Sequence, residues 1–146
     1  MADFTPNNVL TKPLDMSFSK ILAHLRKHYK NGDVSHGITH FIRVAKHCLR
    51  DDMSNPNITI PSALLHDCYH VEKSSPLRRY ASKISAAHAL IILDELHYDH
   101  RLYDDIFHCI EAHSFSANIP IRTAEAQVVQ DADRLDALGY IGIFRC

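Results

Sequence analysis

The stretch SALLHDCYH, residues 62–70, sets the structural problem of this chain. Its apolar run, Ala63–Leu65, is typical of a buried helix, yet it ends on His66 and Asp67 side by side. Burying an unpaired carboxylate is costly, so a buried acid is normally paired with a cation or bound to a metal. The alternative is a histidine that interacts with the helix dipole beside a capping aspartate. In either case the stretch predicts the end of a core helix that carries polar groups.

Apolar residues recur at helical spacing on both sides of this stretch. Phe18, Ile21 and Leu25 share one face of the first such segment, and no segment shows a convincing strand alternation. We therefore expect an all-α domain after an irregular lead-in over residues 1–14, with a polar loop over residues 71–82. The expected helices cover residues 17–30, 38–50, 59–70, 83–96, 103–114 and 124–138.

Composition limits the functional classes. The 146 residues fit one domain, and 16 Lys+Arg against 17 Asp+Glu give a net charge of −1, which argues against a general nucleic-acid surface. No apolar run approaches the roughly 18–20 residues that span a membrane, and the N-terminus lacks the basic-then-apolar pattern of a signal peptide. We therefore expect a cytoplasmic protein whose four cysteines are reduced, since none of them belongs to a CxxC pair.

Histidine is frequent, with 12 residues. His36, His40 and His47 lie on one face of the second predicted helix, although any one such histidine is more often solvated or hydrogen-bonded than a ligand. The segment HGITH, residues 36–40, has the spacing of the HExxH motif of zinc proteases. Because Gly37 stands where that motif requires a general-base glutamate, a protease is excluded.

The last predicted helix contains three acids within QDADRLDAL, residues 130–138. Asp133 lies four residues from both Val129 and Ala137, so it interrupts an apolar face that should point to the core. Asp131 and Asp136 fit a solvated acidic face better. Imidazoles and carboxylates together suit Mn²⁺, Fe²⁺ or Zn²⁺ rather than Ca²⁺, which prefers oxygen ligands. The pattern thus predicts a His2Asp2 metal site, which can activate water and polarise a phosphoryl oxygen.

The order of these motifs carries a family resemblance. HFIRVAKHC, ALLHDC and DADRLDAL resemble the H…HD…D signature of the HD-domain metal-dependent phosphohydrolases. SHGITHFIRV, EAHSFSANIP and AQVVQDADRLDALGYIG are similar to the SHDxxHxxRV, HSFS and QDADRLxALGAIG segments of small bacterial HD hydrolases. The resemblance covers roughly residues 30–146 and implies a compact, all-α HD-domain bundle.

The resemblance also implies a metal centre and a reaction. A divalent ion, with Mn²⁺ favoured over Fe, Zn, Mg and Ni, would be bound singly or as a pair. Water bound to the metal would attack phosphorus in a small phosphorylated substrate, for which a nucleotide is the first choice. Asp131 is the runner-up for the last ligand position. The implied metal ligands are His40, His66, Asp67 and Asp133.

Further site residues are expected around this centre. The resemblance implies that Asp67 orients the attacking water and gives His113, in the matched HSFS segment, a catalytic role. The polar loop after Asp67 is rich in cations, and Lys73 and Arg79 are expected to bind substrate phosphate by charge-assisted hydrogen bonds. Lys73 and His113 are also candidates for moving protons, and a merely solvated loop is the alternative. His88 fits a core histidine better than a ligand to a second metal.

Two departures from the resemblance leave other functions open. Gly37 replaces the aspartate of the SHD pattern, so an acid near the site is missing. The similar hydrolases continue through further helices, so we expect the HD domain over residues 15–146 to be truncated at its C-terminal end. These departures favour a metal-bound nucleotide sensor or binding module without turnover. A di-iron oxygenase is the other alternative, and the oligomeric state is not indicated.

Overall fold

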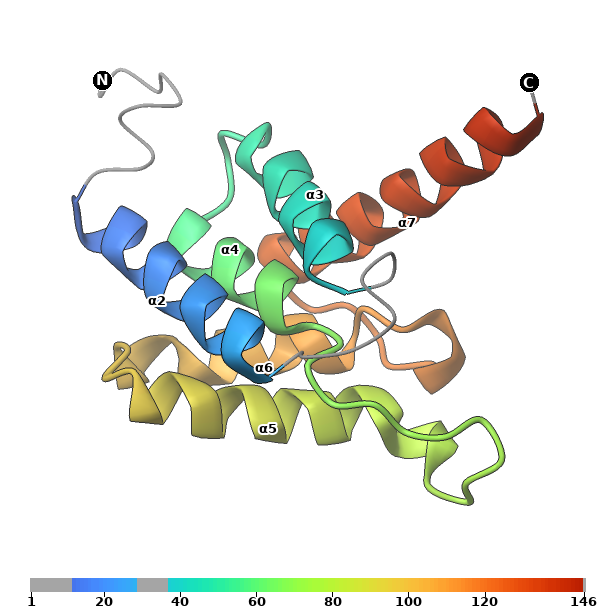
Figure 1. Ribbon diagram of the computed structural model, residues 1–146, viewed down its shortest axis with the longest axis horizontal. Helices are drawn as coiled ribbons and strands as arrows, with labels where there is room; N and C mark the ends of the chain where they lie inside the picture. Colours follow the sequence, from blue (N-terminus) through green and yellow to red (C-terminus); the bar gives the residue numbers. More distant parts are fainter. Residues whose placement is uncertain (1–11, 29–36, 146) are drawn as a thin grey trace.

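The computed structural model describes residues 12–28 and 37–145. Six α-helices and three short 3₁₀ helices occupy this part of the chain, which contains no strand, so the all-α prediction is confirmed (Figure 1). The α-helices are α2 (Lys12–His28), α3 (Ile38–Leu49), α4 (Pro56–Leu65), α5 (Ala81–Glu95), α6 (Tyr103–Glu111) and α7 (Ala124–Arg145). The 3₁₀ helices are η1 (Arg78–Tyr80), η2 (His100–Leu102) and η3 (Phe115–Ala117).

Helix α4 is the centre of the bundle. Every residue from Ile58 to Leu65 is buried, and the helix packs against α2, α3, α6 and α7. Asn55 caps its first turn by accepting a hydrogen bond from the Asn57 amide, and Pro56 follows, where a missing N–H leaves no helical bond unmade. The helix ends at Leu65, earlier than the range 59–70 expected from the sequence. His66 and Asp67 therefore lie in the turn just after α4.

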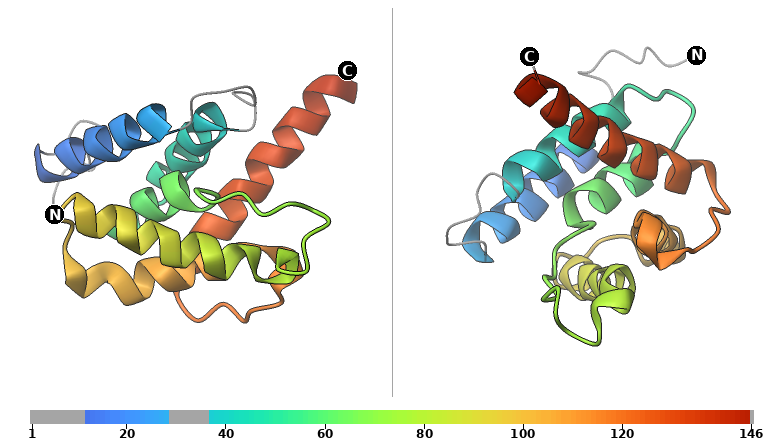
Figure 2. Two further views of the ribbon diagram at one scale, coloured as in Figure 1. Left: turned by 60° about the horizontal axis from the view of Figure 1, so that its bottom comes forward. Right: turned by 90° about the vertical axis from the view of Figure 1, so that its right-hand side faces the viewer.

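The other helices surround α4 and bring distant segments of the chain together. Helices α3 and α7 pack against each other and against α4, while α5 and α6 form a second pair below them (Figure 2). This arrangement places the first turn of α3, the end of α4, the end of α6 and the middle of α7 around one region. The described helices include none with the length and apolar character needed to cross a membrane.

The two ends of the described chain differ from the sequence expectation. Helix α2 begins at Lys12, inside the lead-in expected over residues 1–14, because Pro13 is tolerated in the first turn of a helix. At the other end, α7 runs on to Arg145 instead of ending near residue 138. The lead-in over residues 1–11, the end of the predicted helix 17–30 and His36 of the SHG segment lie outside the described residues.

Helix α7 changes its surroundings along its length. Val129 is fully buried, whereas Leu135 and Leu138 are 54% and 64% exposed, and Ala137 is exposed as well. In both figures the C-terminal half of α7 extends beyond the other helices. The expectation that Ala137 shares a core-facing environment with Val129 is therefore wrong, because the helix leaves the bundle between them.

Candidate metal centre

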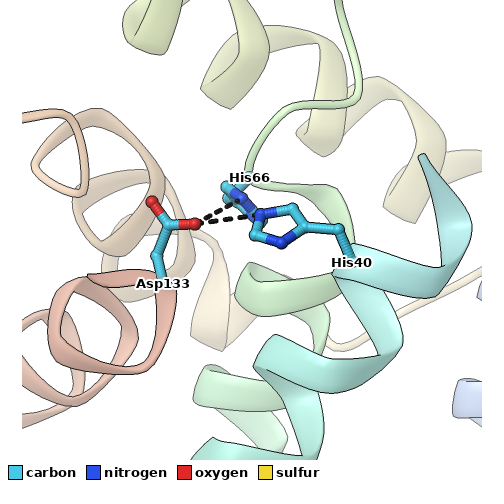
Figure 3. A group of neighbouring side chains, drawn as sticks. All are labelled: His40, His66 and Asp133. Atoms are coloured by element: carbon cyan, nitrogen blue, oxygen red, sulfur yellow. Dashed lines mark ion pairs between the residues drawn. The ribbon is translucent and has the colours of Figure 1, made fainter. Parts of the chain in front are cut away.

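Three helical segments that are far apart in the sequence meet at one carboxylate oxygen. His40 comes from the first turn of α3, His66 from the turn after α4, and Asp133 from the middle of α7 (Figure 3). The Asp133 Oδ1 atom lies 3.0 Å from His40 Nε2 and 3.4 Å from His66 Nε2. Because α3 and α7 both pack on α4, the core of the bundle holds the three side chains together.

A second group of donors shares His66 with the first. Asp67 Oδ2 lies 3.6 Å from His66 Nε2, and Asp67 Oδ1 lies 3.6 Å from Nε2 of His113, which follows α6. Within each of the two triads, His40/His66/Asp133 and His66/Asp67/His113, the donor atoms lie within 4.8 Å of one another. The structure thus places all four predicted ligands, and His113, in one continuous cluster.

The ring orientation of two histidines is fixed by backbone carbonyls. His66 Nδ1 donates to the Ala63 carbonyl at 2.6 Å, and His113 Nδ1 donates to the Ile110 carbonyl at 2.5 Å. A carbonyl oxygen only accepts, so Nδ1 carries the hydrogen in both rings. In the neutral form, Nε2 of each ring therefore presents a lone pair to the cluster, which is the form that binds a metal.

His40 is oriented in the same way by an acid that sequence analysis missed. His40 Nδ1 donates to Asp136 Oδ2 at 2.7 Å, and Asp136 Oδ1 accepts from Arg43 Nε at 2.8 Å. The Asp136 side chain is only 9% exposed, so its assignment to a solvated acidic face is wrong. The sequence did contain a hint of this contact. Asp136 follows Asp133 by three residues and Arg43 follows His40 by three, so each pair can lie on one face of its helix. A carboxylate behind a ligating histidine is a common feature of metal sites.

The contacts at the centre bring acceptors face to face. With hydrogen on each Nδ1, the Nε2 atoms of His40 and His66 and the Asp133 carboxylate all carry lone pairs. His66 is completely buried, and its Nε2 has no hydrogen-bond partner among the described residues. An unsatisfied buried polar atom costs about 1–3 kcal/mol. A cation between these atoms removes that cost, and nitrogen and carboxylate donors suit Mn²⁺, Fe²⁺, Zn²⁺ or Ni²⁺, so the residues present fit a divalent metal.

The protonation equilibria show the same demand for positive charge. Burial lowers the pKa of His66, but a proton on Nε2 would be shared with Asp133 and would face the charges of Asp67 and Asp133, so these contacts raise this pKa to about 9. Removing water from the Asp67 carboxylate raises its pKa, but the hydrogen bond from His113 and the charge of His66 lower this pKa to about 2. Burial likewise raises the Asp133 pKa, and contacts with His40 and His66 bring it well below its usual range. In the metal-free protein, a proton on His66 therefore supplies the positive charge that a metal ion would supply at the same position.

The predicted phosphate ligands lie on the segment after the cluster. Arg79 Nη2 donates to the Tyr80 hydroxyl at 2.7 Å, and its guanidinium lies over the Tyr80 ring at 4.8 Å from the centroid. Lys73 is exposed in the preceding turn. Among the described residues, no hydrogen bond or ion pair joins Lys73 or Arg79 to either triad. Their substrate roles therefore stay predictions.

Two further candidates lie outside the cluster. Asp131 is exposed and accepts a hydrogen bond from Gln127 Nε2 at 2.9 Å, as expected for the outer face of α7. His88 is half-buried, packs edge-on against Tyr69 with ring centroids 5.3 Å apart, and lines a cavity beside α2. Neither residue belongs to the triads, although the environment of His88 is more open than that of a core histidine.

The comparisons with known proteins agree with this architecture. The HD domain family matches residues 37–138, a span that includes every residue of both triads. The chain therefore belongs to the HD domain family. Membership suggests a metal-dependent phosphohydrolase, and the His/Asp cluster is a candidate site for its divalent metal. Searches of curated proteins and of solved structures found no match.

Proposed function

We propose that the protein hydrolyses a phosphoester or phosphoanhydride bond of a small phosphorylated molecule, a nucleotide by first choice, with a divalent metal. The proposed ligands are His40, His66, Asp67 and Asp133, and Mn²⁺ is the favoured ion. The observation that carries the proposal is the set of lone pairs directed at one another, with His66 Nε2 buried and unpartnered. A divalent ion bound there would supply a Lewis acid that polarises a phosphoryl oxygen and acidifies water.

The other proposed roles of the side chains follow from how far each one is exposed to solvent. His66 is buried and fixed, so it serves as an anchor, whereas Asp67 is exposed on the side that solvent reaches. Asp67 can therefore accept a hydrogen bond from a water molecule and orient it. We propose that His113 receives or returns a proton at the same edge, and its Nε2 atom, 3.6 Å from Asp67 Oδ1, supports this role. Lys73 and Arg79 are proposed to bind the phosphate oxygens, and Lys73 is also a candidate proton donor.

An exposed aromatic ring beside the cluster supports a nucleotide substrate. Phe115 lies two residues after His113, and 81% of it is exposed. The guanidinium of Arg134, the neighbour of Asp133, lies 5.0 Å from the centroid of this ring. Aromatic rings and arginine planes are the usual partners of nucleobases, because every base has a face that stacks. The ring and the guanidinium thus offer a base-stacking surface next to the site proposed for phosphate.

Metal analysis and a turnover screen test the proposal together. The purified protein would be analysed for bound metals and then assayed for phosphate release from nucleotides with Mn²⁺, Fe²⁺, Zn²⁺, Mg²⁺ and Ni²⁺. Turnover with at least one ion, lost in Asp133→Asn and kept in Asp131→Asn, is the expected result. Two irons per chain with oxygen consumption and without phosphate release would instead indicate the di-iron alternative.

A nucleotide sensor without turnover is the second candidate. Gly37 precedes α3 and provides no side chain to cap that helix, where the similar hydrolases have an acid. If this acid takes part in proton transfer, its loss leaves metal and nucleotide binding in place and stops hydrolysis. Nucleotide binding that depends on metal, combined with no phosphate release under any metal, would favour the sensor. Restoring turnover with Gly37→Asp would then show which group was missing.

A further inference from the structure

Two pairs of an arginine and an aromatic ring lie on neighbouring elements beside the metal centre. In η1 the Arg79 guanidinium lies over the Tyr80 ring, 4.8 Å from its centroid. At the start of η3 the Phe115 ring has the Arg134 guanidinium over it, 5.0 Å from the centroid. Because η1 and η3 pack against each other, the two pairs belong to one surface of the molecule.

Neither of the two rings serves the hydrophobic core. Phe115 is 81% exposed and Tyr80 is 42% exposed, and neither packs against the buried cluster around α4. A guanidinium covers part of each ring, which leaves aromatic surface free for a further planar group. Exposed apolar surface that gathers in one place marks a binding site more often than isolated exposed residues do.

The position of η1 is fixed by the segment that precedes it. Arg78 Nη1 donates to the Val71 carbonyl at 2.6 Å, which ties η1 back to the chain just after the turn that carries the metal ligands. The Ser75 carbonyl accepts from the Arg78 amide at 3.0 Å, and Arg79 Nη2 donates to the Tyr80 hydroxyl at 2.7 Å. The Tyr80 ring and its guanidinium are therefore ordered before a ligand binds, which reduces the entropy that binding costs.

The two rings are connected to the metal centre in different ways. Phe115 follows His113 by two residues, and its partner Arg134 follows Asp133 directly, whereas Tyr80 joins this surface only through the packing of η1 on η3. One base at Phe115 accounts for a mononucleotide, so Tyr80 offers a place for a second base. The contacting backbone positions of η1 and η3 lie within 8 Å. Neighbouring bases of an extended strand are roughly 7 Å apart, about twice the stacked rise, and therefore match this separation.

We propose that the substrate is a linear dinucleotide, with one base on Phe115 and the other on Tyr80. This inference rests on the proposed function, because it names the substrate class of the same centre. Bases stacked on successive aromatic side chains are a common way of holding a short single strand. A net charge of −1 argues against a longer nucleic acid, whose binding requires many cations. In the hydrolysis, the oxygen of one water molecule bonds to phosphorus, the bond from phosphorus to a sugar oxygen breaks, and that sugar oxygen leaves with a proton of the same water.

Binding of a dinucleotide without metal tests the two-base site. The full-length protein would be titrated in a chelator, so that no metal-dependent hydrolysis consumes the probe, with 5′-phosphorylated diadenylate (pApA) and with ADP. The two probes carry the same formal charge, but only pApA has a second base. The dinucleotide should bind at least about fivefold more tightly than ADP, because a stacked base usually contributes at least this factor. Equal affinities, or no binding of the dinucleotide, would overturn the proposal.

Leucine variants assign each base to a ring, because leucine keeps an apolar side chain and removes the aromatic face. Tyr80→Leu should reduce the dinucleotide affinity to the level of ADP and leave the ADP affinity unchanged, whereas Phe115→Leu should weaken both. Tyr69→Leu is the matched control, because Tyr69 is 48% exposed and belongs to neither pair, so it should match the wild type. All three variants should keep their helical circular dichroism. Unchanged dinucleotide affinity in Tyr80→Leu would overturn the second base position.

Turnover separates this inference from the proposed function. With Mn²⁺ the wild type should convert pApA into AMP, measured by chromatography, and Asp133→Asn should not. If the hydrolase function fails, the preference for dinucleotide binding remains while no phosphorylated compound is cleaved. If the inference fails, mononucleotides are still hydrolysed and pApA is bound no more tightly than ADP.

Discussion

The molecule contains two histidine groups with similar chemistry in different settings. In the HD-domain centre His66 is completely buried, and its Nδ1 is fixed by the Ala63 carbonyl, so Nε2 has one direction. In the cavity that α2 and α5 line, His24 is half-buried and His28 is exposed, and their rings lie against each other with centroids 4.3 Å apart. The difference teaches that backbone and carboxylate partners, more than the number of imidazoles, decide whether a histidine group is preorganised for a metal.

The largest expected effect comes from removing the carboxylate that lies between His66 and His113. Asp67→Ala should abolish phosphate release and strongly weaken metal binding, because Asp67 contacts both His66 and His113. Helix content should stay nearly unchanged, since the exposed Asp67 side chain contributes little to packing. Metal analysis, a phosphate-release assay and circular dichroism check the three parts. Wild-type turnover in this variant would remove Asp67 from the catalytic assignment.

A matched pair on α7 tests the geometry of the first triad. Asp133→Asn should lower metal affinity by at least about 100-fold, because an amide lacks the charge that faces His40 and His66. Asp131→Asn, two residues away on the exposed face, should leave the affinity close to that of the wild type. Isothermal titration with Mn²⁺ measures both. Equal losses would contradict the orientation of α7 described above.

The contrast between preorganised and open histidines is tested most directly at Asp136. Asp136→Asn should weaken metal binding about 10- to 100-fold, the usual effect of removing the partner of a ligating histidine. His40 Nδ1 would then donate to a neutral amide oxygen in place of the charged carboxylate that directs its Nε2 at Asp133. Asp136→Glu should recover part of the affinity, which a purely structural role would not predict. Asp131→Asn again serves as the control.

How far the sequence predicts this site depends on what each residue contacts. Asp133 was predicted to face the core because Val129, four residues earlier, is apolar, and the spacing of a helix is regular. Asp136 was missed because an acid that supports a histidine on another helix looks like any solvated acid in a sequence. The bond from His66 Nδ1 to the Ala63 carbonyl was equally invisible, since it depends on where α4 ends. The exposure of Ala137 could not be predicted from helical spacing, because it depends on how whole helices pack against one another.

The pH dependence of the centre has a definite sign. The pKa of His66 is raised to about 9 from an ordinary value of 6.5, so its proton stabilises the metal-free fold. That stabilisation is fully present below pH 6.5 and is lost as the pH rises through 9. Metal must displace the same proton, so metal affinity should increase by up to about tenfold per pH unit between pH 6.5 and 9.

Two measurements check that the stability of the metal-free protein and its metal affinity change in opposite directions with pH. The thermal midpoint of the protein in a chelator should fall over the pH range 6.5 to 9, while the Mn²⁺ affinity from titration rises over the same range. His66→Gln should lose the pH dependence of the thermal midpoint in this range. A midpoint that increases with pH in the wild type would mean that His66 is neutral in the metal-free protein.

The smallest expected effects concern the cations of the loop after the centre. Lys73→Ala and Arg79→Ala should each raise KM about two- to fivefold, because exposed charge pairs contribute about 0.2–1 kcal/mol. Metal affinity should not change, since neither residue contacts the triads in the described structure. Arg101→Ala is the matched control. Arg101 is exposed, forms an ion pair with Asp99, and follows α5 in the sequence, whereas Lys73 and Arg79 precede it. A fall in metal affinity with an unchanged KM would mean that Lys73 and Arg79 act on the metal centre through the loop and do not bind substrate phosphate.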